Sequence, residues 1–316
     1  MNKPISAARV MVPVKIVPAM IGAGTSVPEP NIANGEVAWV ANAPYVVDDL
    51  RTYNGSVWSC VRDHTGRPTP PETEAAGYWL RKGPTDRMAP FDDYVSTKAR
   101  GTDVLTFVVT PGFANGVKVY GPEGATYSIV ARDGPGGPLL KSVQGDLYAQ
   151  AAGFYELLFQ PLRALDQFGM DNIPLALNTV IVITISSPGG GVVAVGDIKI
   201  GDWRQLIGDS KWGGVVPGAE SQRKTYTYRD YKSDGTYTQT VRPARSRDVT
   251  CRVVLDAEQA MYADAILDEI ADVAVPFEAT GLPRLGYLNT LCFLSGSIRA
   301  DDYGGASLNL TAKGNI

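Results

Sequence analysis

Hydrophobic and polar residues alternate in short runs through the middle of the chain, and turn-forming residues separate the runs. Alternation with a period of two is typical of strands that bury one face. The expected strands are Val104 to Thr110, Val117 to Tyr120, Ala125 to Arg132, Thr179 to Ser186 and Val192 to Ile200. This pattern predicts a β-sandwich or jelly roll over residues 91–200. The pattern between Gly153 and Leu165 is ambiguous and leaves a short helix open.

The pattern changes after residue 200, where residues 201–316 are expected to form an α+β domain. The runs Lys224 to Tyr231 and Thr236 to Arg242 flank an Asp-Gly pair, which is a strong hairpin signal. Further strands are expected at Val249 to Leu255, Val275 to Ala279, Thr290 to Arg299 and Ala306 to Ala312.

One amphipathic helix is expected over Asp256 to Asp272. Asp256 is a good N-cap residue, and Gln259 stands at the capping-box position. The apolar residues with helical spacing are Ala263, Ile266, Leu267, Ile270 and Ala274. This stripe predicts that the helix packs on a sheet.

The N-terminal residues 1–35 are expected to form an extended arm and linker. Val10 to Ile21 is apolar but is interrupted by Pro13, Lys15 and Pro18, and a spanning helix needs about 20 apolar residues. The arm is expected to pack on a sheet or to clamp a neighbouring subunit by strand addition. Deleting residues 1–30 should then impair assembly and leave the globular domains folded.

Composition limits the chemistry. The net charge of −4 provides no basic field for nucleic acid. The single histidine, His64, excludes any site built from two imidazoles. Cys60, Cys251 and Cys292 show no CxxC spacing, so we expect reduced, partly buried thiols in a protein made in the cytosol.

Catalytic motifs are missing from the sequence. It has no GxSxG elbow, no phosphate-binding loop and no HExxH pair. Cys60 and His64 are four residues apart in a strand and its loop, where that spacing does not guarantee contact. We therefore expect no enzyme, no cofactor and no metal, although accidental carboxylate pairs leave a glycosidase open.

Charge is unevenly distributed in the last domain. Asp264, Asp268 and Asp272 are spaced to line one helix face, where like charges repel. The preceding hairpin region is basic, with candidate interface residues Arg223, Lys224, Arg229, Arg245 and Arg247. The two surfaces could meet between subunits in a head-to-tail ring. Alternatively, both are solvated or pair within one subunit.

Residues 36–90 form a small aromatic module. Its landmarks are Trp39, Tyr45, Trp58, His64-Thr65 and Trp79. This order resembles the small chitin-binding, carbohydrate-binding module appended to chitinases. The resemblance implies that Trp39, Tyr45, Trp58 and Trp79 could stack on sugar rings. The alternative is that they form the core of a module too small to be stable otherwise.

The junction after this module is a second landmark. Four segments resemble, in the same order, segments of a family of tailed-bacteriophage tail and baseplate proteins. They are Gly83 to Asp92, Phe159-Gln160-Pro161, Val195 to Gly201 and Ser221 to Lys224. Residues 201–316 are also similar to the ring-forming domain of tail tube and distal tail proteins.

The phage resemblance implies a function. We expect a structural component of the distal tail or baseplate of a long-tailed phage, made in the host cytoplasm and located in the virion. Its expected partners are other tail or baseplate proteins, further copies of itself, and a tail fibre or host surface glycan. We expect no nucleic-acid partner and no membrane span. The alternatives are a carbohydrate-binding adhesin and a polysaccharide-degrading enzyme.

Overall fold

The computed structural model describes residues 8–149, 153–160, 162–206, 214–240, 245–301 and 305–315. The chain is mainly β, as the alternation predicted, with one long helix. It divides into two compact units, one of residues 1–14 with 199–316 and one of residues 15–198. Each unit is described separately below.

The unit of residues 15–198 contains two groups of strands. The aromatic module has a three-stranded sheet, in the order β2-β3-β4. The other strands form a four-stranded sheet, β6-β11-β8-β9, and the pairs β7-β10 and β5-β12. The bounds are β2 Leu50–Tyr53, β3 Ser56–Cys60, β4 Trp79–Pro84, β5 Ala99–Thr102, β6 Val104–Val109, β7 Gly116–Tyr120, β8 Thr126–Asp133, β9 Leu139–Asp146, β10 Gln167–Met170, β11 Thr179–Ser186 and β12 Val192–Val195.

The core of the larger group lies on one face of the four-stranded sheet. Phe107 on β6, Ile129 on β8 and Ile183 on β11 are fully buried, and along each strand the buried positions alternate with more exposed ones. The ring of Tyr127 on β8 stacks on that of Phe168 on β10, with centroids 4.2 Å apart, and so joins the four-stranded sheet to the β7-β10 pair. The pleat therefore leaves residues such as Ser128 on the opposite, outer face.

The run from Val192 to Ile200 was expected to be one strand, but strand pairing is interrupted at Gly196 and the run forms two strands. The first is β12, and the second is β13 (Asp197–Gln205). A Cβ atom at Gly196 would lie 2.5 Å from the carbonyl oxygen of Val95. The close approach of these backbones explains why glycine stands there and why the strand is interrupted.

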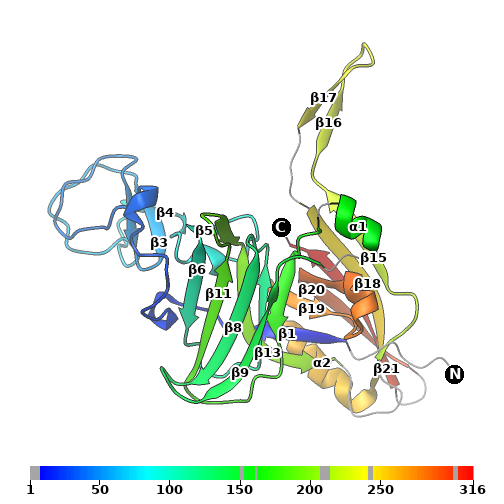
Figure 1. The fold of residues 1–316 in the computed structure, drawn as a ribbon. Coiled ribbons are helices and arrows are strands. Elements are labelled where there is room, and N and C mark those ends of the chain that lie inside the picture. The colour runs from blue at the N-terminus through cyan, green and yellow to red at the C-terminus, as the bar shows by residue number, and fades with distance from the viewer. Residues whose placement is uncertain are drawn as a thin grey trace. The chain divides into compact units, whose positions relative to one another are not determined.

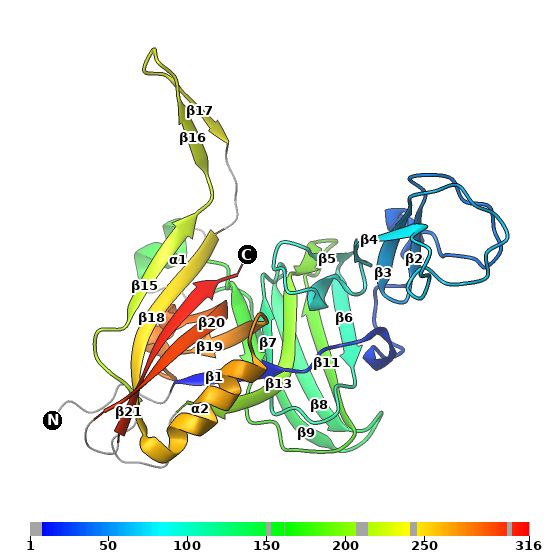
Figure 2. The same cartoon turned by 180° about the vertical axis from the view of Figure 1, so that it is seen from behind.

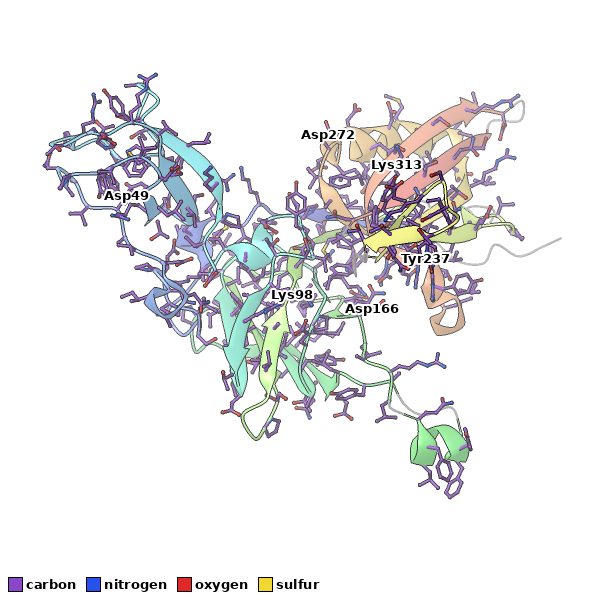
Figure 3. All side chains as sticks on the ribbon, turned by 90° about the horizontal axis from the view of Figure 1, so that it is seen from above. Asp49, Lys98, Asp166, Tyr237, Asp272 and Lys313 are labelled. Atoms are coloured by element: carbon purple, nitrogen blue, oxygen red, sulfur yellow. The ribbon has the colours of Figure 1, made fainter. Side chains whose placement is uncertain are left out.

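A short helix, α1 (Phe154–Phe159), lies in the region whose pattern was ambiguous. It is at the tip of an excursion between β9 and β10. The base of the excursion is held by hydrogen bonds from Ala149 N to Arg163 O and from Leu165 N to Leu147 O. Figure 3 shows α1 at the far end of this excursion, whose base lies near the labelled Asp166.

The second unit contains a large antiparallel sheet with a helix on it and a separate two-stranded hairpin (Figure 1). Its strand order is β13-β1-β19-β20-β21-β18, and β14 and β15 both pair with β18. The bounds are β1 Arg9–Pro13, β14 Gly214–Val215, β15 Glu220–Thr225, β16 Tyr228–Tyr231, β17 Tyr237–Thr240, β18 Arg245–Asp256, β19 Ala274–Glu278, β20 Asn289–Ala300 and β21 Gly305–Gly314.

Helix α2 (Ala257–Glu269) packs on this sheet, as its apolar stripe predicted. Ala263, Ile266 and Ile270 are buried, and Gly296 on β20 makes room for Leu267, because a Cβ there would lie 2.8 Å from the Leu267 side chain. The helix is shorter than expected. Asp256 makes no side-chain capping bond, so the predicted capping box is wrong.

The N-terminal segment is extended and packs on a sheet, which was one of the two expected alternatives, but it does so as an interior strand of its own chain. β1 lies between β13 and β19, with Val10 and Met11 fully buried. Residues 21–26 then run along β6, where Gly22 N donates to Val108 O and Ser26 N to Thr106 O. The segment is therefore part of the sheets of its own chain. Because of this pairing, the expectation that both units stay folded without residues 1–30 is wrong.

The expected hairpin is divided between two pairings. Lys224 and Thr225 end β15, which pairs with β18, whereas β16 and β17 pair only with each other among the described residues. The turn is where the Asp-Gly pair predicted it, with Gly235 at φ 83°. Residues 241 and 242 of the predicted hairpin lie outside the described residues. Figures 1 and 2 both show β16 and β17 projecting beyond the ends of β15 and β18.

Candidate functional site

The aromatic module has a small core built from three of its landmark residues. Tyr45 (4% exposed), Cys60 (0%) and Trp79 (8%) pack together. The Tyr45 hydroxyl donates to Val40 O at 2.8 Å and accepts from Val40 N at 2.7 Å. Tyr45 and Trp79 therefore have no ring face open to a sugar, and their position agrees with the core interpretation.

His64 belongs to the same core. Its ring lies 5.4 Å from the ring of Trp79 and 5.0 Å from that of Tyr78, both edge to face. Nδ1 lies 2.9 Å from the carbonyl oxygen of Arg62. Because a carbonyl only accepts, Nδ1 carries the proton and donates it there.

Cys60 is also a structural residue. Its thiol donates to the same carbonyl of Arg62, at 3.0 Å, and burial raises its pKa. The Nδ1 of His64 lies 3.6 Å from the sulfur but is committed to Arg62, so it has no lone pair to accept the thiol proton. The pair therefore lacks the base that an activated cysteine needs.

Trp39 and Trp58 are half-buried and gather around the turn between β2 and β3. The ring of Trp39 lies 5.5 Å from that of Tyr53, edge to face, and Trp58 Nε1 lies 3.4 Å from Tyr53 O. Tyr53 was not among the predicted site residues. The Asn54-Gly55 turn that follows it is the sequence signal for a hairpin that brings Tyr53 to Trp58.

Polar residues brace the remaining aromatic side chain of the module. The guanidinium of Arg67 lies 3.6 Å from the centroid of the Tyr78 ring and pairs with Glu74 at 3.0 Å. Glu74 in turn accepts from Tyr78 N at 3.2 Å. This face of the module is therefore held by cation–π and ionic contacts within the chain.

The acidic candidates of the last domain lie on α2 and just beyond it. Asp264 and Asp268 are exposed on the helix. Asp272 lies past the helix end at Glu269, in a left-handed turn with φ 61°, so the expected row of three on one helix is wrong. Acidic side chains at a helix C-terminus oppose the helix dipole, which agrees with the early end. Within the described ranges these three carboxylates make no ion pair.

The basic candidates are partly paired within the chain. Lys224 contacts Asp248, which raises the pKa of Lys224. Burial acts to raise the pKa of Asp248, but hydrogen bonds from Lys224 and Gly314 N outweigh it and hold that pKa below its usual value. Arg247 donates to Tyr287 O at 3.0 Å.

The other basic candidates differ in their surroundings. Arg223 is exposed on β15, directly across from Arg247 on β18. The guanidinium of Arg229 lies 5.7 Å from the centroid of the Tyr237 ring on the hairpin. The side chain of Arg245, the first residue of β18, lies outside the described residues.

The described residues offer neither a metal cluster nor a membrane-spanning helix. Within those ranges, no three His, Cys, Asp or Glu side chains come together in a way that could hold a metal ion. None of the helices described is long and apolar enough to span a bilayer.

Comparisons with known proteins add little. No family model matches the sequence, and no curated protein matches it. A solved structure, chitosan-binding module 1 from a chitosanase/glucanase of Paenibacillus sp. IK-5, is 12% identical and covers 36% of this chain and 83% of its own. The TM-score is 0.24, which is too low to carry an argument about fold or ligand.

Proposed function

We propose that this protein is a structural component of the distal tail or baseplate of a long-tailed bacteriophage. In this proposal it is made in the host cytoplasm, assembles as an oligomer in the virion and supports tail fibres or host attachment. The single observation that carries the proposal is the projecting hairpin β16–β17, which has the properties of an assembly element.

The hairpin is exposed along its whole length. Every residue from Tyr228 to Thr240 is exposed, including Tyr231 and Tyr237, whose rings lie 5.7 Å apart. A two-stranded hairpin alone is at best marginally stable in water, and tyrosine is enriched at protein interfaces. A partner that covers the hairpin would stabilise it. Figure 3 labels Tyr237 on this hairpin.

The charge distribution supports contacts between copies. Asp264 and Asp268 are exposed and make no ion pair within the described residues, and Arg223 and Arg229 are exposed on β15 and β16. Opposite charges on different faces of one unit suit a heterologous, head-to-tail contact. Lys224 contributes less, because Asp248 already pairs with it.

Helix α1 supports the same conclusion from the other unit. Phe154 (76% exposed), Tyr155 and Phe159 (70%) present large apolar surface to solvent. Monomeric proteins rarely expose contiguous apolar patches of more than a few hundred Å², and larger ones mark interaction sites. An assembly subunit would bury this surface against a neighbour.

The experiment is a cryo-EM reconstruction of the tail tip of virions whose genome encodes this chain. The proposal expects density for a closed ring of copies, with β16–β17 seated on the adjacent copy. Virions whose tail tip lacks the chain, or a genome that holds no tail tube or tape-measure gene near it, would contradict the proposal.

A second candidate function is a carbohydrate-binding adhesin, favoured by the half-exposed Trp39 and Trp58 around Tyr53. Two flat rings near one turn provide a surface on which a sugar can stack. The test is a glycan array with the full chain and its Trp58→Ala variant, checked by circular dichroism. Binding that the variant loses supports the adhesin, whereas no binding to any glycan contradicts it.

A further inference from the structure

We propose that the outer face of the sheet β6-β11-β8-β9 is a binding site for a neutral sugar unit, separate from the aromatic module. A groove of about 350 Å³ lies on this face. That volume is within the range of small-ligand sites, about 300–1,000 Å³. The site does not depend on either function proposed above.

Strand register arranges the lining in a grid. On β8, Thr126 lies between Ser186 of β11 and Asp146 of β9, and Ser128 lies between Thr184 and Gln144. These six side chains share the outer face because each is two residues from its neighbour on the strand. Adjacent strands are about 4.8 Å apart, so polar groups recur at a spacing that suits the hydroxyls around one sugar ring.

The grid offers both donors and acceptors. Four of the six residues carry hydroxyls, which donate and accept, and the Gln144 amide does both. Thr126 Oγ1 and Ser186 Oγ already lie 2.7 Å apart, so one hydroxyl pair is oriented in advance. Asp146, which is exposed, adds a carboxylate that can accept from two neighbouring sugar hydroxyls.

The charge of the lining selects the class of ligand. Asp146 is its only ionised residue, and no lysine or arginine lines the groove. Phosphate, sulfate and acidic sugars would therefore meet a carboxylate with no compensating cation. A neutral sugar has no such cost.

The floor of the groove is held in place by packing beneath it. Tyr127 points to the buried side, where it stacks on Phe168, and its ring covers Gly145, whose Cβ would lie 3.0 Å from that ring. Tyr127 and Gly145 also line the groove, but the Tyr127 ring is stacked on Phe168, so the six polar side chains supply most of the contacts to the sugar. We therefore expect weak binding, with a Kd on the order of 1 mM.

The test uses ligand-observed saturation-transfer NMR on the full chain. The probes are three neutral oligomers, maltohexaose, cellohexaose and chitohexaose, with hexagalacturonate as the acidic comparison. The proposal expects transfer to at least one neutral oligomer and none to the acidic one. No transfer to any neutral oligomer at about 5 mM would overturn it.

Variants place the binding. Asp146→Asn should weaken it about tenfold, because hydrogen bonds to a charged group are the strong ones, and Ser128→Leu should abolish it by filling the groove. The matched control Asp133→Asn changes an exposed carboxylate at the opposite end of β8 and should leave the Kd within about twofold.

One further variant separates this site from the module. Trp58→Ala should leave the binding unchanged. Binding that survives both Asp146→Asn and Ser128→Leu, or that is lost with Trp58→Ala alone, would overturn the inference. Loss with Asp146→Asn and Ser128→Leu but not with Trp58→Ala would establish the groove even if the protein proved to have no part in a phage tail.

Discussion

Gly55 holds a position in the module that no other residue can occupy without strain. Its φ of 72° is in the left-handed region, and a Cβ atom there would lie 2.6 Å from Pro18 Cγ and 2.8 Å from Met88 Cγ. Its N–H donates to Glu29 Oε1 at 2.8 Å. The turn between β2 and β3 is thus packed directly on the segment that precedes the module.

Replacing Gly55 by alanine should destabilise the module more than the same change at an open glycine. Left-handed backbone costs about 1–2 kcal/mol, and overpacking adds about 1–3 kcal/mol. Gly66 has nearly the same φ, 73°, but no atom within 4 Å of a Cβ. Thermal unfolding of Gly55→Ala and Gly66→Ala separates the two effects, and equal losses in both variants would contradict the packing argument.

The three cysteines should react slowly in the folded protein. All three are buried and free, and burial raises the pKa of Cys251 to about 11 and that of Cys292 further still. The thiolate is the reactive form, so at pH 7.5 almost none of it is present.

Titration with a thiol reagent checks this expectation. All three thiols should react once the chain is unfolded in denaturant. In the native protein, none of the three should react within hours. Fast labelling of Cys60 in native protein would show that the module's core is open.

Residue roles within the module could be predicted only in part. The spacing of aromatic residues located the module, but it could not distinguish Tyr45 and Trp79, which are buried, from Trp39 and Trp58, which are half-buried. The burial of Tyr45 and Trp79 depends on the contact between them, which joins β4 to a residue more than thirty positions earlier. Local sequence patterns do not predict such a contact.

At the scale of elements, the sequence did not predict that β1 is an interior strand of the sheet. Pro13, Lys15 and Pro18 indicated an extended arm whose loss would leave the globular domains folded, yet β1 pairs with β13 along its whole length and with β19 at Arg9 and Val10. Arg9 also pairs with Glu278 of β19 at 2.5 Å. Pro13 is tolerated because it stands at the end of the strand.

Removing residues 1–13 should unfold the unit of residues 199–316. The truncation exposes the edges of β13 and β19 and leaves space where Val10 and Met11 were buried; loss of one such side chain alone costs about 2–5 kcal/mol. Removing only residues 1–7, which leaves β1 complete, is the matched control. Limited proteolysis should digest the first variant and spare the second, and equal resistance would show that β1 is dispensable.

Strands β6, β7, β8, β11 and β18 to β21 could be predicted, because alternation and turn residues are local signals. Strands β5, β9, β10 and β14 were not predicted. The errors arose where distant backbone decides the outcome. β12 and β13 separate at Gly196 because of Val95, and β15 leaves the hairpin to pair with β18. The groove on the outer sheet face was not foreseen, since its six polar side chains come from three strands whose register is visible only in the fold.

At the scale of the whole chain, two compact units each expose an element that has no partner in the described residues. One exposes the tyrosine-rich hairpin β16–β17, and the other exposes the apolar helix α1. Exposed apolar and aromatic surface is costly for a monomer and useful for a subunit. Both exposed elements therefore favour a chain that assembles with other subunits, and the proposed sugar site on the sheet β6-β11-β8-β9 is a separate property.

The most direct test of that claim is the particle mass of the purified chain, measured by mass photometry at low salt, alone and with the tail proteins encoded beside it. We expect closed rings at whole multiples of 33.8 kDa. Added salt should weaken these rings, because exposed charges are screened beyond about 10 Å at 0.1 M. Replacing residues 228–240 by a short glycine-serine turn should return the mass to that of one chain. An unaltered chain that stays at 33.8 kDa under all these conditions would contradict assembly into rings.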